Sequence, residues 1–481
     1  MKIKINFKNK FFFDIDLDLL YMAYGMFPQN KVIENFTKTQ NQNHTSEKAN
    51  DNTGILPVNG HDIYNYVARY GMANFKIQTI LKLDSKLDHE MLLKAVRLSV
   101  DAEPVFGCRL MQNQPPYWKR LDDIDKTTFC SFEETDNLDE AIEVFLESPL
   151  DMDNDPMVKL KLISSGEYDT LCVKINHTCC DGTGTKEYLK LLSDIYTCLD
   201  IYGDYIPKPS VRSRHDQDRL FSELGIKDPE AAWNPLLDIP KTMWAFPWLQ
   251  GKRNIASVAV NRFSKGHIEE LYEYGKAREA KINDIILTAF YRAMFEMSQP
   301  LPGIPMDISS TVDLRRYLPK QKTEAIRNFS GGFDTRIARV ADEPFEGTLS
   351  RVVTMMNAIK NGRPGLQSAI GLERVEKANF YETLSFYQTA SQCSGYIDKC
   401  APVLSNLGFI DKTFLKFGKT YVEDAYIVPP AVSAPGILLC VSSYNGILTL
   451  AISYYQAQVR CDDVERLLNL IKKELIANCG L

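Results

Sequence analysis

A histidine and an aspartate four residues apart, His177 and Asp181, form the part of the sequence best suited to chemistry. His177 follows an apolar segment (169–176) that predicts a strand, and precedes an amphipathic segment (about 183–200) that predicts a helix. Such a turn presents side chains at the rim of a sheet, and Gly182 relaxes the backbone there. A neutral imidazole can remove a proton from a hydroxyl, amine or thiol that attacks a carbonyl. Asp181 could hold the turn through a buried ion pair.

Spacing alone fits a structural core histidine at His177 as well as a catalytic one. Competing motifs are weaker: Glu187 stands where a dinucleotide fingerprint needs its third glycine, and no Gly-x-Ser-x-Gly elbow occurs. No Cys-x-x-Cys pair accompanies the turn, which argues against a zinc site, and nothing marks Cys179 as a low-pKa nucleophile. The other histidines are interpreted as solvated surface side chains: His44, His61, His89, His215 and His267.

Strands and helices mix on both sides of His177 without strict alternation, which predicts an α+β chain of two similar lobes. Residues 1–54 form an N-terminal extension, and the Asn- and Gln-rich stretch 29–54 is predicted to be disordered. The first lobe is expected at 55–204 and contains the histidine motif. A proline-containing crossover segment follows at 205–253, and the second lobe is expected at 254–481.

The composition is that of an ordinary globular protein. The 481 residues include 56 Lys and Arg against 62 Asp and Glu, a net charge of −6. A mildly acidic chain has no general attraction for phosphate backbones, so we expect no nucleic-acid partner. No apolar run reaches bilayer-spanning length, so no membrane span is predicted. Eleven cysteines, two of them adjacent at 179–180, indicate reduced thiols and a cytoplasmic protein.

The sequence NHTCCDG, residues 176–182, resembles the HHxxxDG signature of the chloramphenicol-acetyltransferase-like superfamily. That group includes nonribosomal-peptide condensation domains, alcohol acetyltransferases, wax-ester synthases and polyketide-associated acyltransferases. Asn176 replaces the first histidine of the signature, a position that varies in the acetyltransferase branch. The resemblance extends from about Leu56 to the end of the chain. Further segments resemble family segments in the same order: 75–110, 280–294, STVDLRRYLP (310–319), NFSGGFDTRI (328–337) and LSNLGFID (404–411).

The resemblance implies two acetyltransferase-like lobes that form a V with a tunnel between them. His177 would be the general base that activates the acceptor, and Gly182 would leave room near the reacting carbonyl. Asp181 would pair with one of two adjacent arginines, and the motif position favours Arg315 over Arg316. Asn406, in the Ser-Asn-Leu-Gly segment, is a candidate substrate contact. No metal or cofactor is implied, because the acyl-CoA or phosphopantetheinyl thioester is itself a substrate.

We therefore expect a freestanding acyltransferase, similar to the alcohol acetyltransferases, that moves an acyl group from a CoA or carrier-protein thioester to a hydroxyl or amine. Its partners would be the acyl thioester and a small alcohol or amine. If the acyl group is carried by a protein, an acyl or peptidyl carrier protein would be a further partner. Two alternatives stay open. One is a condensation-type enzyme that forms amides from carrier-bound substrates, and the other is a non-catalytic family member that acts as a binding module.

Overall fold

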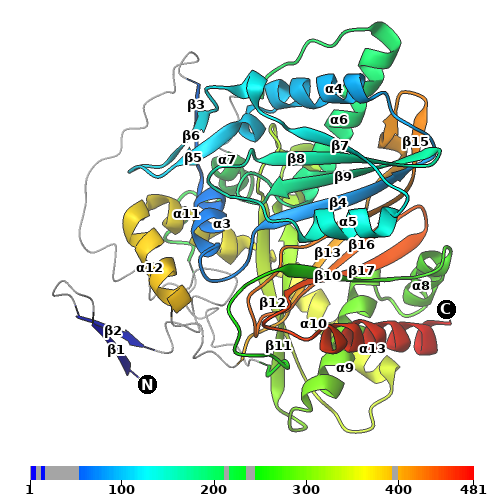
Figure 1. Ribbon diagram of the computed structural model, residues 1–481. Helices are drawn as coiled ribbons and strands as arrows, with labels where there is room; N and C mark the ends of the chain where they lie inside the picture. Colours follow the sequence, from blue (N-terminus) through cyan, green and yellow to red (C-terminus); the bar gives the residue numbers. More distant parts are fainter. Residues whose placement is uncertain are drawn as a thin grey trace.

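The computed structural model describes residues 2–6, 12–16, 54–210, 216–233, 244–392 and 399–480. Its main body contains two six-stranded mixed sheets, each packed against helices (Figure 1). The α+β class and the two sheet-rich lobes agree with the prediction from sequence.

The first sheet lies in the N-terminal lobe and has the strand order β14-β15-β4-β9-β8-β7. The strands are β4 (Lys76–Leu83), β7 (Cys130–Glu134), β8 (Val158–Ser165), β9 (Tyr168–Asn176), β14 (Lys416–Phe417) and β15 (Thr420–Val428). Apolar side chains on one face, such as Ile77, pack against α4 (His89–Ala102) and α6 (Gly182–Tyr202). Ile80 on the other face packs against α5 (Leu138–Glu147). Burial on both faces explains why β9 reads as a continuous apolar run.

The second sheet has the order β10-β17-β16-β13-β11-β12. Its strands are β10 (Ala256–Arg262), β11 (Pro305–Asp313), β12 (Ser330–Ala338), β13 (Val403–Phe409), β16 (Leu438–Tyr444) and β17 (Ile447–Tyr455). The helices of this lobe are α8 (His267–Lys276), α9 (Ile282–Ser298), α10 (Phe345–Asn361) and α13 (Cys461–Cys479). The apolar stripe of α13, from Val464 to Leu475, is buried in the same cluster as most of α9. Strands β11, β13 and β16 run parallel to one another.

Strands β14 and β15, from the C-terminal half of the chain, join the sheet of the N-terminal lobe, so no single chain position separates the two lobes. Strand β15 pairs antiparallel with β4, with Tyr426 opposite Ile80, and thereby belongs to the first sheet. The expected lobe 254–481 therefore has to be corrected for residues 416–428. The residue pattern of 421–428 predicts an extended strand, but it does not show which strand pairs with it, because strand pairing is a long-range property.

The remaining described elements surround the junction of the lobes. A three-stranded sheet contains β3 (Ile55–Pro57), β5 (Cys108–Met111) and β6 (Tyr117–Arg120). Helix α3 (Gly60–Ala68) packs against α11 (Leu366–Lys377) and α12 (Phe380–Gln392). In the crossover segment, α7 (Asp216–Glu223) packs on Leu314 and Phe329. Strands β1 (Lys2–Asn6) and β2 (Phe12–Asp16) pair with each other. The stretch 29–53 lies outside the described residues.

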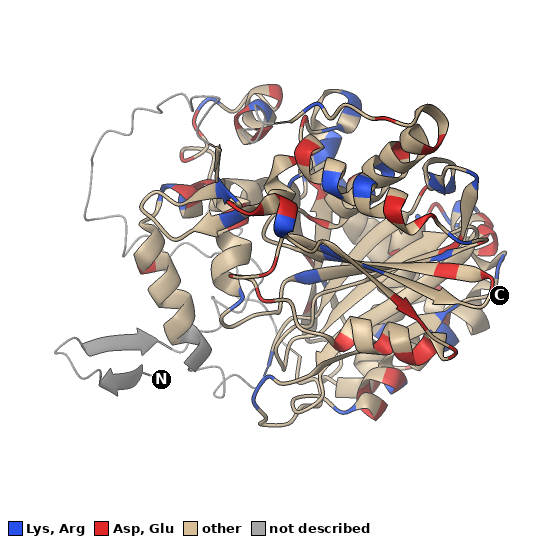
Figure 2. Ribbon diagram, turned by 45° about the horizontal axis from the view of Figure 1, so that its top comes forward, with Lys and Arg blue, Asp and Glu red and all other residues tan. Residues whose placement is uncertain are grey.

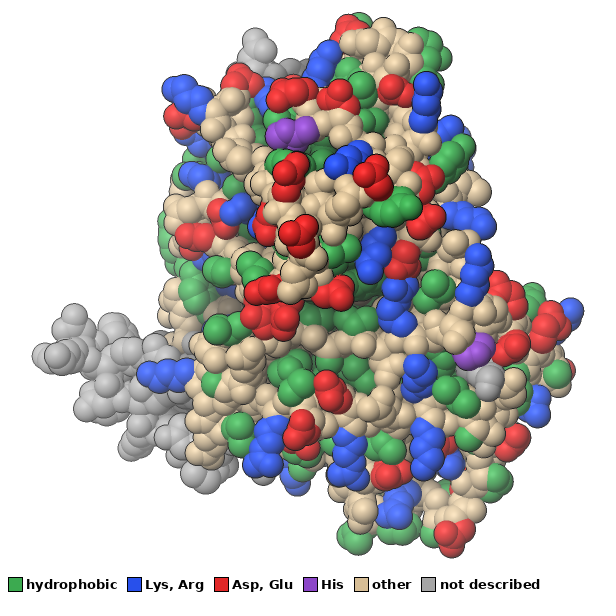
Figure 3. All heavy atoms as spheres, turned by 45° about the vertical axis from the view of Figure 1, so that its right-hand side comes forward, with side chains coloured by type: hydrophobic (Ala, Val, Ile, Leu, Met, Phe, Trp, Pro, Cys, Tyr) green, Lys and Arg blue, Asp and Glu red, His purple; other side chains and the backbone are tan. Residues whose placement is uncertain are grey.

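The surface carries both signs of charge. Basic and acidic positions are interspersed on both lobes (Figure 2). On the face drawn in Figure 3, hydrophobic side chains lie scattered among Lys, Arg, Asp and Glu. Within the described part of the chain, no helix is long and apolar enough to span a bilayer.

Candidate active site

The histidine motif occupies the turn between β9 and α6, and local hydrogen bonds fix its shape. Asp181 has an extended backbone and caps α6, because its Oδ1 accepts a hydrogen bond of 2.7 Å from the Gly184 amide. The buried Asn176 accepts a hydrogen bond from the Thr178 amide at 3.0 Å. The His177 amide donates to the carbonyl of Phe75, the residue just before β4, at 2.7 Å. The asparagine that replaces the first signature histidine thus stabilises the turn.

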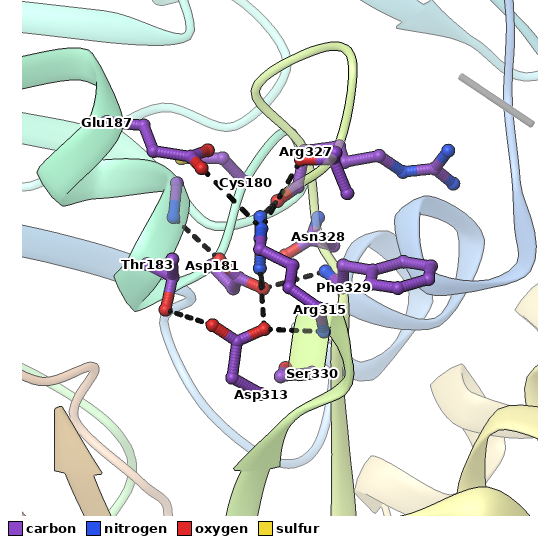
Figure 4. A network of polar contacts seen from close by, with 12 residues as sticks. Cys180, Asp181, Thr183, Glu187, Asp313, Arg315, Arg327, Asn328, Phe329 and Ser330 are labelled. Atoms are coloured by element: carbon purple, nitrogen blue, oxygen red, sulfur yellow. Dashed lines mark hydrogen bonds and ion pairs between the residues drawn. The ribbon is translucent and has the colours of Figure 1, made fainter. Parts of the chain in front are cut away.

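Asp181 forms a buried ion pair that crosses from one lobe to the other (Figure 4). Its Oδ2 lies 3.0 Å from Nη1 of Arg315, which belongs to the 3-10 helix Leu314–Tyr317 after β11. The same oxygen accepts a hydrogen bond of 2.7 Å from the Phe329 amide. Burial alone would raise the pKa of Asp181, but the Arg315 charge and the hydrogen bonds hold it below its ordinary value. Arg316 is exposed, so Arg315 is the arginine that faces the motif.

Two acidic side chains contact Arg315 and a threonine contacts one of them, and none of the three was predicted as a site residue from the sequence (Figure 4). Asp313 Oδ1 accepts hydrogen bonds from the Arg315 amide at 2.9 Å and from its Nη1 at 3.2 Å. The hydroxyl of Thr183, in the first turn of α6, donates to the other oxygen of Asp313 at 2.9 Å. Glu187 lies 3.8 Å from Arg315 Nε, and burial raises its pKa to about 7. Asp313 stands beside Arg315 in the VDLR segment, which was the available signal.

The hydrogen bonds of Asn328 determine which nitrogen of the His177 ring carries the proton. Asn328 is fully buried, and its Nδ2 donates to the carbonyl oxygens of His177 at 3.0 Å and Thr178 at 2.8 Å. These two acceptors fix the orientation of the amide, so its Oδ1 faces His177 Nδ1 at 3.0 Å. An amide oxygen can only accept, so Nδ1 must carry the hydrogen. The lone pair of the neutral ring is therefore on Nε2.

The surroundings of His177 favour the neutral ring. Burial lowers its pKa below the ordinary 6.5, although its own carbonyl, Asp181 and Asn328 oppose part of this effect. The ring of Phe75 meets the imidazole edge to face, with 5.9 Å between the ring centres. At neutral pH the side chain is thus an unprotonated base, as proton abstraction requires.

A cavity of about 300 Å³ lies between the lobes and reaches the motif. The predicted site residues that line it are His177, Asp181, Gly182 and Asn406. Arg315 is not among the lining residues and contacts the turn through Asp181. Asn406 also contacts protein: its Nδ2 donates to Asn283 at 3.2 Å, and its Oδ1 accepts from the Gly408 amide at 3.0 Å.

Gly182 packs closely beneath the other lobe. A methyl group built at this position would lie 2.4 Å from Cδ2 of Leu407, a residue of β13. Any larger residue at this position would have to displace the Leu407 side chain.

His61 departs from the surface position that was expected. It is 4% exposed and lines the cavity, and its Nε2 lies 2.9 Å from the Ser330 carbonyl. Burial and the charge of Arg327 lower its pKa to about 4. Every residue of α3 is buried, because the helix is enclosed by the junction of the lobes. His89 and His267 are half-buried, and His44 and His215 lie outside the described residues.

Other chemistry at the motif finds little support in the geometry. Within the described ranges, no three His, Cys, Asp or Glu side chains are grouped as metal ligands would be. Cys179 is buried, and its thiol lies 3.0 Å from the Asn176 carbonyl. Burial raises the pKa of the adjacent Cys180 well above its ordinary value, which keeps that thiol protonated.

Comparisons with known proteins agree with the resemblance seen in the sequence. Residues 71–300 match the model of the Condensation domain family. No curated protein matches the chain. Among solved structures, the TRI3 trichothecene 15-O-acetyltransferase from Fusarium sporotrichioides shares 14% identity and a TM-score of 0.66, with 90% of this chain and 96% of that one covered.

Two condensation domains have the same fold. The first condensation domain of the CDA synthetase aligns at 14% identity and a TM-score of 0.65, covering 89% of this chain and 97% of its own. A point mutant of the starter condensation domain of rhizomide synthetase, in complex with C8-CoA, aligns at 12% identity and a TM-score of 0.60. The alignment covers 88% of this chain and 94% of that one. Residues 71–300 thus match the Condensation domain family, and the described chain has the fold of condensation domains and of the TRI3 acetyltransferase.

Proposed function

We propose that this protein is an acyltransferase that moves an acyl group from a CoA or carrier-protein thioester to a hydroxyl or amine, with His177 as the general base. One observation carries the proposal. Asn328 holds the proton on Nδ1 of His177, which leaves the Nε2 lone pair on a ring that lines the interlobe cavity.

The reaction needs one base and no bound metal. Nε2 of His177 takes the proton of the acceptor as its oxygen or nitrogen attacks the thioester carbonyl. When the tetrahedral intermediate collapses, the carbon–sulfur bond breaks and the thiolate recovers the proton from the imidazolium. Positioned general-base catalysis is worth about 10²–10⁴-fold, and the proximity of two bound substrates supplies much of the remaining acceleration.

The other motif residues act by positioning. The pair of Asp181 and Arg315 holds the turn that carries His177, and Gly182 allows the two lobes to approach each other. A non-catalytic binding module would not need a preset tautomer or a neutral ring at the cavity. These features therefore favour an enzyme.

The structural neighbours support both kinds of donor. One is by name an O-acetyltransferase, and another was solved with C8-CoA, which favours a CoA thioester and a hydroxyl acceptor. The family match to condensation domains favours the second candidate, amide formation between carrier-bound substrates. The role of His177 as general base is the same in the two cases, whereas the carrier of the acyl group and the kind of acceptor differ.

The test is a free-thiol release assay with a panel of acyl-CoAs and pooled alcohols and amines. It compares the wild type with His177→Ala and with His89→Ala, a half-buried histidine outside the cavity lining. We expect acceptor-dependent release that is lost in His177→Ala and kept in His89→Ala. Amide formation that occurs only when the acyl group and the amine are both bound to carrier proteins would indicate the condensation-type enzyme. Full activity of His177→Ala would contradict the mechanism.

A further inference from the structure

The lining of the interlobe cavity changes from apolar to polar along strand β13. Val403 at the start of the strand and Asn406 near its end both line the cavity, and three residues of strand span about 10 Å. Strands β11 and β16 flank β13 and run parallel to it, with Ser309 of β11 and Leu438 of β16 both paired with Val403. Residues further along these strands therefore lie toward the second end of the cavity.

The second end carries charged and hydroxyl groups, beside the apolar Val312 and Leu407. Thr311 and Asp313 come from the end of β11, and Thr183 and Lys186 come from the first turns of α6. The Lys186 ammonium donates to the Leu407 carbonyl at 2.8 Å. Charged and hydroxyl groups at this end can bind polar parts of a substrate.

The first end, which we name the apolar arm, is formed by hydrocarbon side chains of both lobes. It consists of Met72, Phe75, Val403, Ile427, Val432 and Ile437. Small neighbours, among them Ala401, also line it and leave space. The arm starts at the reacting group itself, because the ring of Phe75 meets that of His177. The charged side chains among the described lining residues come from the motif, from β11 and from α6 rather than from the arm.

We infer that the apolar arm binds the hydrocarbon chain of the acyl thioester, so that the preferred donor carries a medium or long acyl chain rather than acetyl. This inference rests on the proposed function. The pantetheine amides and phosphates of a thioester need several polar partners, and beside Met72 the arm offers only the hydroxyl residues Tyr64 and Ser433. An alkyl chain gains free energy by leaving water there. An acetyl group would leave the arm without an occupant.

The expected effect can be stated per methylene group. Burying one CH₂ is worth about 0.8 kcal/mol, and with RT of about 0.59 kcal/mol this is about fourfold in affinity. Binding should therefore tighten about fourfold for each added CH₂ until the arm is filled, and then level off.

The experiment measures binding without turnover. Non-transferable S-alkyl-CoA thioethers, from ethyl to dodecyl, are titrated calorimetrically into the full-length protein. Ala401→Phe fills the arm and should weaken binding of octyl-CoA while ethyl-CoA binds as before. Ile437→Ala enlarges the arm and should move the plateau to longer chains. Ala277→Phe adds the same bulk at the exposed end of α8, outside the cavity lining, and should leave the dependence on alkyl length unchanged.

The outcomes separate this inference from the proposed function. Binding that tightens with chain length supports the arm, even if no thioester is turned over, in which case the proposed function alone fails. Equal affinity for ethyl and octyl thioethers would overturn the arm and leave the transferase proposal standing. The arm would also be wrongly assigned if turnover depended on the length of alkanol acceptors and not on that of the donor.

Discussion

The contact of Asn328 with His177 gives the most informative mutation in the site. In Asn328→Leu, a side chain of similar size loses the oxygen that accepts from His177 Nδ1 at 3.0 Å. A buried hydrogen bond contributes about 0.5–1.5 kcal/mol net, and an unsatisfied buried partner costs about 1–3 kcal/mol. Losing about 1–3 kcal/mol of stabilisation of the reactive form of the ring corresponds to a fall in kcat/KM for acyl transfer of about 5- to 150-fold. The carbonyls of residues 177 and 178 also lose a donor, so some loss of stability will accompany it.

Asn65→Leu is the matched control for this mutation. Asn65 Nδ2 donates to the same His177 carbonyl at 3.2 Å and lies 3.4 Å from the same Nδ1. An amide NH₂ cannot accept a hydrogen bond from Nδ1, so this contact does not stabilise the Nδ1–H form. We expect only a small loss of activity, less than that of Asn328→Leu.

The direct assay is ¹⁵N NMR of labelled histidine, in which protonated and unprotonated ring nitrogens have separate chemical shifts. The wild type should show the hydrogen of His177 on Nδ1, Asn65→Leu should show the same, and Asn328→Leu should show a mixture. A wild-type ring with its hydrogen on Nε2 would refute the reasoning. So would identical spectra and activities for the two variants.

Three further predictions concern the turn and its histidine. Arg315→Met leaves Asp181 buried and unpaired, so the free energy of unfolding in urea should drop by about 3–5 kcal/mol, and a drop below about 1 kcal/mol would contradict the structure. Gly182→Ala places a methyl group 2.4 Å from Cδ2 of Leu407, so that side chain must move and transfer should fall, recovering in part when Leu407→Ala is added. Unchanged transfer would show that the approach is not tight. Burial lowers the pKa of His177 below 6.5, so the base stays unprotonated as the pH falls to that value. The acid limb of the pH profile of kcat/KM should therefore lie below pH 6.5, and an acid limb above pH 6.5 would contradict the burial of His177.

The turn itself could be predicted from sequence because its determinants are local. An apolar strand, a short polar turn and an amphipathic helix follow one another within thirty-odd residues, and an aspartate at the first turn of α6 is a normal N-cap. The partner of Asp181 came from the resemblance, which located Arg315 in the VDLR segment. Its burial and its hydrogen bond to the Arg327 carbonyl at 2.9 Å required the structure.

Contacts between distant segments could not be predicted in the same way. Asn328 is separated from His177 by 151 residues, and although it begins the segment NFSGGFDTRI, nothing in that segment indicates a contact with His177. His61 looked exposed because a helix start in the sequence does not show that a second lobe covers it. Strand β15 was recognised as extended, but its pairing with β4 depends on how the whole chain folds back. In each case the missing information is tertiary rather than local.

The central claim is that His177 is the base for acyl transfer, and mass spectrometry of the acceptor tests it most directly. Octanoyl-CoA and an alcohol acceptor identified in the panel are incubated with the wild type and with His177→Gln, a polar replacement that cannot act as a base. The account predicts that the acceptor gains the mass of the octanoyl group with the wild type and does so at least about 100-fold more slowly with the variant. Equal rates of acyl transfer in two well-folded proteins would contradict it.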